Sequence, residues 1–182
     1  MIRKNMLLIV CFFIPSLFLS QTSPKNHIIG ASLGFSFLGS VPQYGLNYEY
    51  PFNKKELGFD NAGVIGIGGI FRYWNYSENF INVDWEYKNV ILGAQINYHF
   101  YMADDNIDPW LGLVVAYNFS SSDAKIKTVG FEVGENSNNG IWAGANAGVR
   151  YWLSEKTAIN LRIGFGSLSY GAIDFGFDYK LK

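Results

Sequence analysis

The C-terminal segment from Ser169 to Lys182 alternates between apolar and polar side chains over most of its length. One set is Ile173, Phe175, Phe177, Tyr179 and Leu181, and the other is Ala172, Asp174, Gly176, Asp178 and Lys180. Because successive side chains of a β-strand point to opposite faces, this pattern predicts a strand with one apolar face and one polar face. A strand at the end of a chain also needs a partner along each edge. The rest of the chain must therefore supply a sheet that this strand can join.

Seven further segments repeat the alternation. They span residues 29–37, 44–52, 64–73, 90–101, 111–119, 141–151 and 158–166. Most are separated by short connections with turn-forming residues, such as Gly39–Pro42, Asn53–Glu56 and Ser154–Thr157. The sequence therefore predicts eight antiparallel strands joined in up-and-down order.

Two connections are longer, Trp74–Lys88 and Ser120–Asn139, and we interpret both as loops. Within the first, the apolar residues alternate in the phase opposite to that of the following strand. A slip of one residue near Lys88 predicts either a β-bulge or a strand that leaves the membrane and continues outside. Within the second, residues 124–133 are β-prone, which indicates a hairpin projecting beyond the sheet.

The polar face of the predicted strands is rich in Gly, Asn, Ser and Ala, whereas a sheet facing water is usually rich in Lys, Glu and Thr. Apart from lysines, which lie at turns, loops and strand ends, its charged residues are three arginines and three carboxylates: Arg72, Arg150, Arg162, Glu49, Asp174 and Asp178. Guanidinium groups pair with carboxylates through two parallel hydrogen bonds, so this set indicates an internally neutralised interior. The apolar face carries no charged residue in any predicted strand.

We therefore predict that the apolar face meets lipid and that the polar face lines a lumen. In hydrocarbon every backbone amide must be paired within the protein, so the sheet must close on itself. The predicted fold is all-β: a closed antiparallel up-and-down eight-stranded transmembrane β-barrel. A barrel of this size has a bore that its own side chains can fill.

The first 20 residues have the features of a secretory signal peptide. Arg3 and Lys4 precede an apolar stretch that is too short to span a bilayer, so we assign residues 1–20 to the signal and residues 21–182 to the barrel domain. Removing these two bases lowers the formal net charge from −1 to −3, which argues against a nucleic-acid-binding protein. The only cysteine, Cys11, lies in the signal, so we expect neither a disulfide nor a thiolate metal site in the mature chain. No cofactor is expected.

The mature chain resembles the small eight-stranded outer-membrane β-barrel family of the OmpA/OmpX type. The resemblance is carried by Gly148–Trp152, Ser154–Thr157, Ile163–Gly166 and Gly176–Leu181. It implies a location in the outer membrane, in contact with lipid and with both termini on the periplasmic side. It also implies that the last strand is read by the barrel insertion machinery during assembly. The family usually ends on an aromatic residue, whereas here Leu181 is followed by Lys182.

The polar residues of the lumen are the first candidate site. Turn counting across the last hairpin predicts that Arg162 pairs with Asp174, or with Asp178 below it. Arg72, Arg150 and Glu49 are expected to complete one network with His99 and Asn97. Because an orphaned charge is costly in a lumen with little water, replacing both Arg162 and Asp174 is predicted to recover much of the stability lost by replacing Arg162 alone.

Three other patterns allow a functional and a structural interpretation. His99 is either the general base of a lipid-modifying enzyme or a hydrogen-bonded lumen residue, and we favour the latter because its phase offers no nearby serine. The aromatics of the first long connection form either a partner-binding surface or an interfacial girdle: Trp74, Tyr76, Phe80 and Trp85. Residues 104–109 resemble a calcium loop, but Pro109 replaces the required glycine, so we predict a solvated turn and no metal site.

Together these patterns predict a non-enzymatic outer-membrane barrel with a plugged, charge-paired lumen. Partner binding is expected through the connections 74–88 and 120–139. The alternatives are a secreted, soluble, lipocalin-like barrel with its aromatic face inside, a small pore, and a lipid-modifying enzyme.

Overall fold

The computed structural model describes residues 25–53, 63–80, 83–126, 133–137, 139–167 and 171–181, so the predicted signal peptide lies outside the described residues. The regular secondary structure there is entirely β. The strands are β1 (Ile28–Ser36), β2 (Val41–Asn53), β3 (Val64–Phe80), β4 (Val83–His99), β5 (Ile107–Ile126), β6 (Val133–Ser137), β7 (Gly140–Trp152), β8 (Thr157–Gly166) and β9 (Gly171–Lys180). No helix in these ranges is long and apolar enough to cross a membrane.

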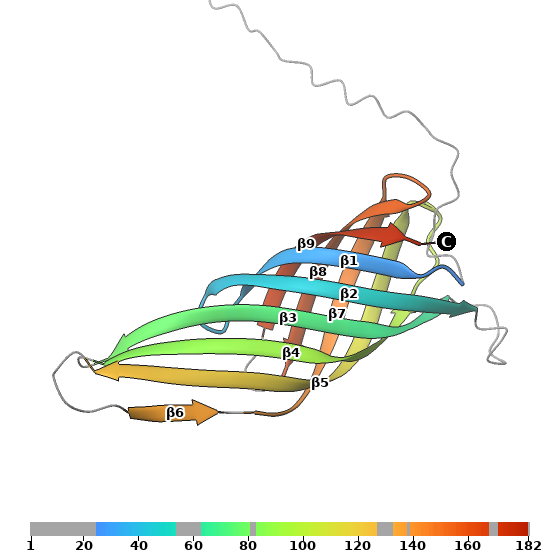
Figure 1. Ribbon diagram of the computed structural model, residues 1–182. Helices are drawn as coiled ribbons and strands as arrows, with labels where there is room; N and C mark the ends of the chain where they lie inside the picture. The colour runs from blue at the N-terminus through green and yellow to red at the C-terminus, as the bar shows by residue number, and fades with distance from the viewer. Residues whose placement is uncertain are drawn as a thin grey trace, which may run out of the picture.

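Eight of these strands close into a barrel, as predicted (Figure 1). Each strand pairs antiparallel with its neighbour around the ring, β9 pairs with β1, and the pairing of β4 with β5 completes the circle. β6 lies outside this ring and pairs with β5 alone. Ser121 opposite Ser137 and Asn118 opposite Gly140 belong to one register, so β6 prolongs β7 along β5.

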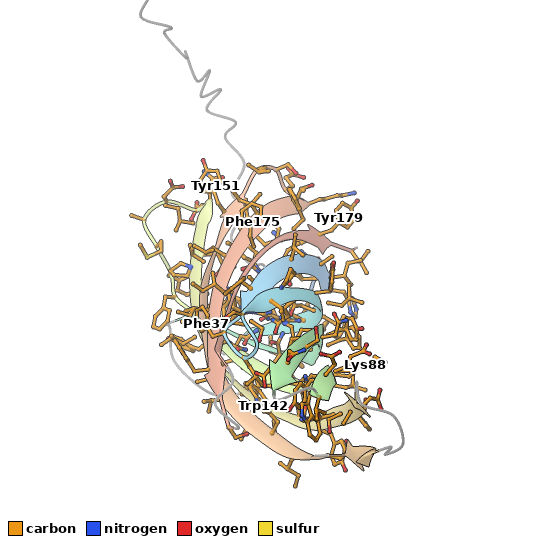
Figure 2. All side chains as sticks on the ribbon, turned by 90° about the vertical axis from the view of Figure 1, so that its left-hand side faces the viewer. Phe37, Lys88, Trp142, Tyr151, Phe175 and Tyr179 are labelled. Atoms are coloured by element: carbon orange, nitrogen blue, oxygen red, sulfur yellow. The ribbon has the colours of Figure 1, made fainter. Side chains whose placement is uncertain are left out.

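The wall separates apolar from polar side chains as the alternation predicts. Large apolar residues project outward from every strand of the ring; Leu113 is 64% exposed and Ile141 is 78% exposed. Phe175 and Tyr179 lie on the same outer surface (Figure 2). Arginines and carboxylates are buried inside the ring. The alternative of a lipocalin-like barrel requires the reverse arrangement and is therefore wrong.

One part of the wall extends beyond the other strands. β2 pairs with β3 only as far as Tyr73, whereas β3 and β4 remain paired without interruption up to Phe80 and Val83. Trp74–Phe80 thus adds roughly 20 Å at about 3.3 Å per residue. We call the part of the sheet beyond the ring the extension: residues 74–80 of β3, 83–89 of β4, 120–126 of β5, and β6 (Figure 1).

The extension corrects one prediction and decides between two predicted alternatives, a bulge near Lys88 or a strand that continues. Trp74–Lys88 is not an aromatic loop but a strand hairpin, with residues 81 and 82 outside the described part. No bulge lies near Lys88, because Asn75 pairs with Lys88 and Trp74 with Asn89 in an unbroken register. The strand instead continues, and its apolar phase reverses because the outer face of the extension is no longer the lipid-facing face.

Two apolar clusters occupy the interior. The larger lies toward the extension: Ile70, Trp74, Ile91, Val114, Ala116, Trp142 and Ala172. The smaller lies at the opposite end, where β1 begins and β9 ends, which we call the terminal end: Ile28, Trp152 and Ala158. The buried charged residues lie at inward-facing positions of the strands that run between these clusters.

Candidate functional site

The first charged cluster in the lumen is built around Asp174. In the β8–β9 register Arg162 lies directly opposite Asp174, and its Nε donates a hydrogen bond of 3.0 Å to Asp174 Oδ2. Arg72 Nε lies 3.3 Å from the same oxygen, and Gln43 Nε2 donates to Oδ1 at 2.9 Å. One carboxylate is therefore shared by two guanidinium groups; we call this group the Asp174 cluster.

Asn47 holds the two guanidinium groups of this cluster in place. Its Oδ1 accepts from Arg72 Nη2 at 2.6 Å and from Arg162 Nη1 at 2.8 Å. Arg72 also donates to the backbone carbonyls of Leu46 and Phe71. These acceptors supply part of the negative electrostatic potential that Asp174 alone does not provide for two cations.

The second charged cluster is built around Arg150. Arg150 Nη2 donates to Glu49 Oε2 at 2.5 Å, and its Nε donates to Asp178 Oδ2 at 2.5 Å. His99 bridges Glu49 and Asp108, with Nε2 2.6 Å from the first and Nδ1 2.7 Å from the second. Arg150 Nη1 lies 3.6 Å from Asp108, which closes the group. We call it the Arg150 cluster.

The predicted lumen residues therefore do not form one network. Arg72 belongs with Asp174, while Glu49, His99 and Asp178 gather around Arg150. Asn97 is buried, but neither polar atom of its amide has a hydrogen-bond partner within the described residues. Asn97 is thus a lumen residue that belongs to neither cluster.

Asp108 is a lumen residue that the sequence analysis missed. The sequence predicts a solvated turn there, yet β5 already begins at Ile107 and Asp108 is only 2% exposed. Pro109 suggested a turn, but it stands on the outward phase near the start of the strand, where proline is tolerated. The alternation of the strand could have revealed this position, because Asp108 shares its face with Trp110 and Gly112.

Glycines on neighbouring strands make room for the lumen carboxylates. A Cβ added at Gly30 would overlap the carboxylate of Asp178, and one at Gly34 would overlap that of Asp174. Glu49 lies over Gly66 in the same way. Each carboxylate therefore lies against a bare stretch of neighbouring backbone, and this close approach lets the side chains meet within a narrow bore.

Large side chains also occupy the lumen. Trp74, Trp110, Trp142 and Trp152 are each at most 3% exposed, and Lys180 Nζ lies 3.9 Å from the ring centre of Trp152 at the terminal end. A cavity between the larger apolar cluster and the Asp174 cluster measures only about 10 Å³. That is space for about one water molecule.

His99 does not have the arrangement that a general base requires. Both ring nitrogens are within hydrogen-bond distance of carboxylates, at 2.6 and 2.7 Å. Two carboxylate acceptors are satisfied when both nitrogens carry protons. Neither nitrogen is then free to accept a proton from a nucleophile, so the geometry is that of a bridge between two acids.

The candidate aromatic surface is divided by the structure. Trp74 is buried in the larger apolar cluster, whereas Tyr76 and Trp85 are half-buried on the inner face of the extension. Tyr87 joins them: its ring is stacked on Tyr76 at 4.6 Å and 18°, and it lies 6.4 Å from Trp85 at 17°. The girdle interpretation is therefore wrong for these residues, and the side chain of Phe80 lies outside the described residues.

The environment of Tyr76 is partly apolar and partly acidic. Burial, together with the charge of Glu78 and the neighbouring Tyr87, raises the pKa of the Tyr76 phenol above its ordinary value. The turn between β1 and β2 covers one side of the ring, because a Cβ at Gly39 (φ 77°) would overlap it. This turn thus lies at the base of the inner face of the extension.

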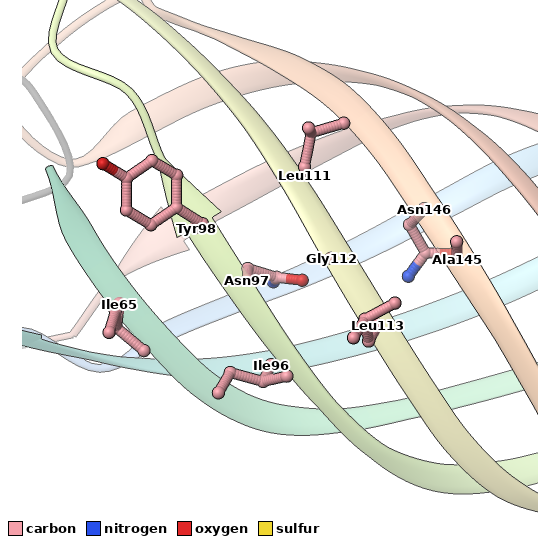
Figure 3. A pocket seen from close by; sticks show the side chains of 9 residues that line it. All are labelled: Ile65, Ile96, Asn97, Tyr98, Leu111, Gly112, Leu113, Ala145 and Asn146. Atoms are coloured by element: carbon pink, nitrogen blue, oxygen red, sulfur yellow. The ribbon is translucent and has the colours of Figure 1, made fainter.

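A groove also lies on the outer wall, across β3, β4, β5 and β7 (Figure 3). It measures about 440 Å³ and is lined chiefly by apolar side chains, including Ile96, Leu111, Leu113 and the small Ala145. Ile96, Leu111 and Leu113 are outward-facing and exposed. The groove therefore opens on the apolar surface of the barrel.

A family model described as Opacity family porin protein matches residues 63–174 of the chain. Among solved structures, the N-terminal β-barrel domain of OprF from Pseudomonas aeruginosa has a TM-score of 0.57 at 13% identity, covering 87% of this chain and 98% of that one. OprG from the same organism has a TM-score of 0.57 at 14% identity, covering 90% and 99%.

Ail from Yersinia pestis, solved with the heparin analogue sucrose octasulfate, has a TM-score of 0.54 at 13% identity, covering 86% and 97%. At these identities the likeness to solved structures concerns the fold. No curated protein sequence matches the chain.

Proposed function

We propose that the barrel is a non-conducting scaffold that presents the extension to partners at the cell surface. The premise is that this chain belongs to the Opacity family of porin proteins and lies in the outer membrane. The proposal has two parts. The barrel anchors the protein in lipid, and the sheet formed by the extension, with the connection 120–139, contacts the partner. The terminal end faces the periplasm.

The main support for a plugged lumen is that the side chains that occupy the bore also pair their charges with one another. Arg150 contacts three carboxylates and Asp174 contacts two arginines, so moving one side chain out of the bore would leave buried charges unpaired. Removing one partner of a buried pair costs about 3–5 kcal/mol. Such a plug is stable on the timescale of ion passage, and a small pore is disfavoured.

A non-enzymatic role is supported by the engagement of both ring nitrogens of His99. The remaining partners follow from the location. Acyl chains of the membrane fill the groove beside Leu113, and the terminal strand β9 is the segment that the insertion machinery reads during assembly.

Planar-bilayer recording tests the non-conducting scaffold. Folding of the purified barrel is checked by its faster gel migration before boiling. The barrel is then recorded in one bilayer, and a general porin is recorded in a separate bilayer as the positive control. We expect no steady conductance from the wild type under conditions in which the control opens. A stable nanosiemens-scale channel would overturn the proposal and place the function in transport through the lumen.

A further inference from the structure

The inner face of the extension carries one carboxylate among its aromatic rings. Glu78 of β3 lies directly opposite Trp85 of β4 in the register, and Tyr76 lies directly opposite Tyr87. Tyr76 and Glu78 are two residues apart on one strand and therefore share a face. The charge of Glu78 reaches the Tyr76 phenol, consistent with this placement.

Glu78 differs from the other carboxylates of the extension whose side chains are described. Glu86 and Asp123 lie 3.5 and 3.8 Å from Lys88 Nζ, and Asp84 accepts a hydrogen bond from Asn79. Glu78 is exposed and has no ion pair or hydrogen bond within the described residues. It is a negative charge beside aromatic rings whose counter-charge is not supplied by a described neighbour.

This combination matches the chemistry of a guanidinium group. A planar cation is attracted to the face of Trp or Tyr, and the same group forms a two-point contact with a carboxylate. Tyr76, Tyr87 and Trp85 provide near-parallel rings, and Glu78 lies across from Trp85. We propose that the inner face of the extension binds an arginine side chain of a basic, extended segment of a protein partner.

The backbone beside Glu78 supports an extended ligand. β2 no longer pairs with β3 beyond Tyr73, so no strand in the described part of the chain pairs with that edge of β3 from Trp74 onward. Such an edge accepts a further strand through main-chain hydrogen bonds, while alternate side chains of that strand reach the sheet face. An arginine on the inward phase of the added strand would lie over the rings.

The net charge of the hairpin distinguishes between the possible ligands of this surface. Residues 74–88 carry Glu78, Asp84 and Glu86 against Lys88 alone, so the hairpin is acidic. This favours a basic peptide and opposes a sulfated sugar of the kind bound by Ail. The inference rests on the proposed role of the extension in partner binding.

A peptide titration tests the inference. The probe is acetyl-Thr-Val-Arg-Val-Thr-amide, with the same peptide carrying neutral citrulline in place of arginine as its control. Binding to the folded full-length barrel in micelles is followed by NMR at the indole N–H of Trp85. We expect Glu78→Gln and Trp85→Leu to weaken the arginine peptide about threefold each, and salt to weaken it further. For Trp85→Leu the backbone amide of Tyr87 replaces the lost indole signal.

Glu86→Gln is the matched control, because Glu86 lies on the outer face of the same hairpin and is paired with Lys88. It should leave the affinity unchanged. Equal binding of the citrulline peptide, or equal losses in Glu78→Gln and Glu86→Gln, would contradict the inference. A response of Trp85 to maltohexaose or sucrose octasulfate instead of the arginine peptide would assign the surface to sugars. None of these results alters the bilayer test, so failure of the peptide site is distinguishable from failure of the non-conducting scaffold.

Discussion

Asp174 illustrates how a single residue can control the stability of the lumen. It lies 3.3 Å from Arg72 Nε, accepts from Arg162 and accepts from Gln43, so it is shared by three donors. A pairwise hypothesis therefore underestimates its role. In an interior of low dielectric, the cost of a substitution depends on how many charges lose their only opposite charge.

The number of charges that lose their only opposite charge predicts an order of stability for three variants. Asp174→Leu leaves Arg72 and Arg162 without a carboxylate, Arg162→Leu with Asp174→Leu leaves only Arg72, and Arg162→Leu leaves Asp174 still paired with Arg72. We expect Arg162→Leu to cost least because it orphans no charge, the double variant to cost about 3 kcal/mol, and Asp174→Leu about 5 kcal/mol or more. Urea unfolding in micelles measures the order.

An isolated pair would behave differently. In that case the double variant would be more stable than either single variant, as the sequence alone predicts. That result would contradict the shared role of Asp174.

At the scale of strands, the carboxylates of the lumen depend on glycines of neighbouring strands. Gly34 of β1 lies against Asp174 of β9, and Gly30 lies against Asp178. The bore is too narrow for a methyl group at these positions. Each carboxylate therefore packs directly against the glycine of the neighbouring strand.

Gly34→Ala is therefore predicted to destabilise the barrel by about 1–3 kcal/mol, because the new Cβ meets both the Asp174 carboxylate and the Ile173 backbone carbonyl. Gly69→Ala is the matched control: its Cβ would face only a carbonyl oxygen at 3.5 Å. Thermal unfolding, followed by the loss of the fast-migrating gel band, compares the two. Equal losses would show that strand propensity, and not lumen packing, governs both sites.

The extension shows a second property of strands. Below Tyr73 the outward phase of β3 is apolar, with Ile67 47% exposed, whereas Asn75 and Ser77 continue the same phase beyond the ring. A strand keeps its geometry while its surroundings change, so the aromatic residues move to the inner face. This explains why the apolar phase slips near Lys88 although the register does not.

For the whole molecule, the outward apolar surface follows from the membrane. An outward charge in mid-wall faces hydrocarbon, whereas an outward charge on the extension faces water. Leu113 is 64% exposed in the middle of the transmembrane part of β5, and Ser77 is exposed on the extension.

Leu113→Lys should therefore cost about 2–4 kcal/mol in a bilayer, whereas Ser77→Lys should change stability little. Unfolding in lipid vesicles measures both. A similar small effect at both positions would place Leu113 outside the hydrocarbon, contrary to the transmembrane assignment.

The sequence by itself determined the number of ring strands, their antiparallel order and the face that the side chains of the predicted strands occupy. The physical reason is that lipid imposes one rule on every strand: apolar outward and polar inward, with a period of two residues. Ile173, Phe175 and Phe177 obey this rule locally, without reference to any other strand. Arg162 and Asp174 were also predictable as neighbours, because the short turn between them limits their register.

Only the tertiary structure decided which charges meet across the lumen. Glu49 and Arg150 are far apart in the sequence, and their contact depends on how the strands are staggered around the ring. The same stagger assigns Arg72 to Asp174 and brings Asp108 to His99. Strand length beyond the membrane was likewise undetermined, because outside lipid the alternation no longer distinguishes a strand that continues from a loop.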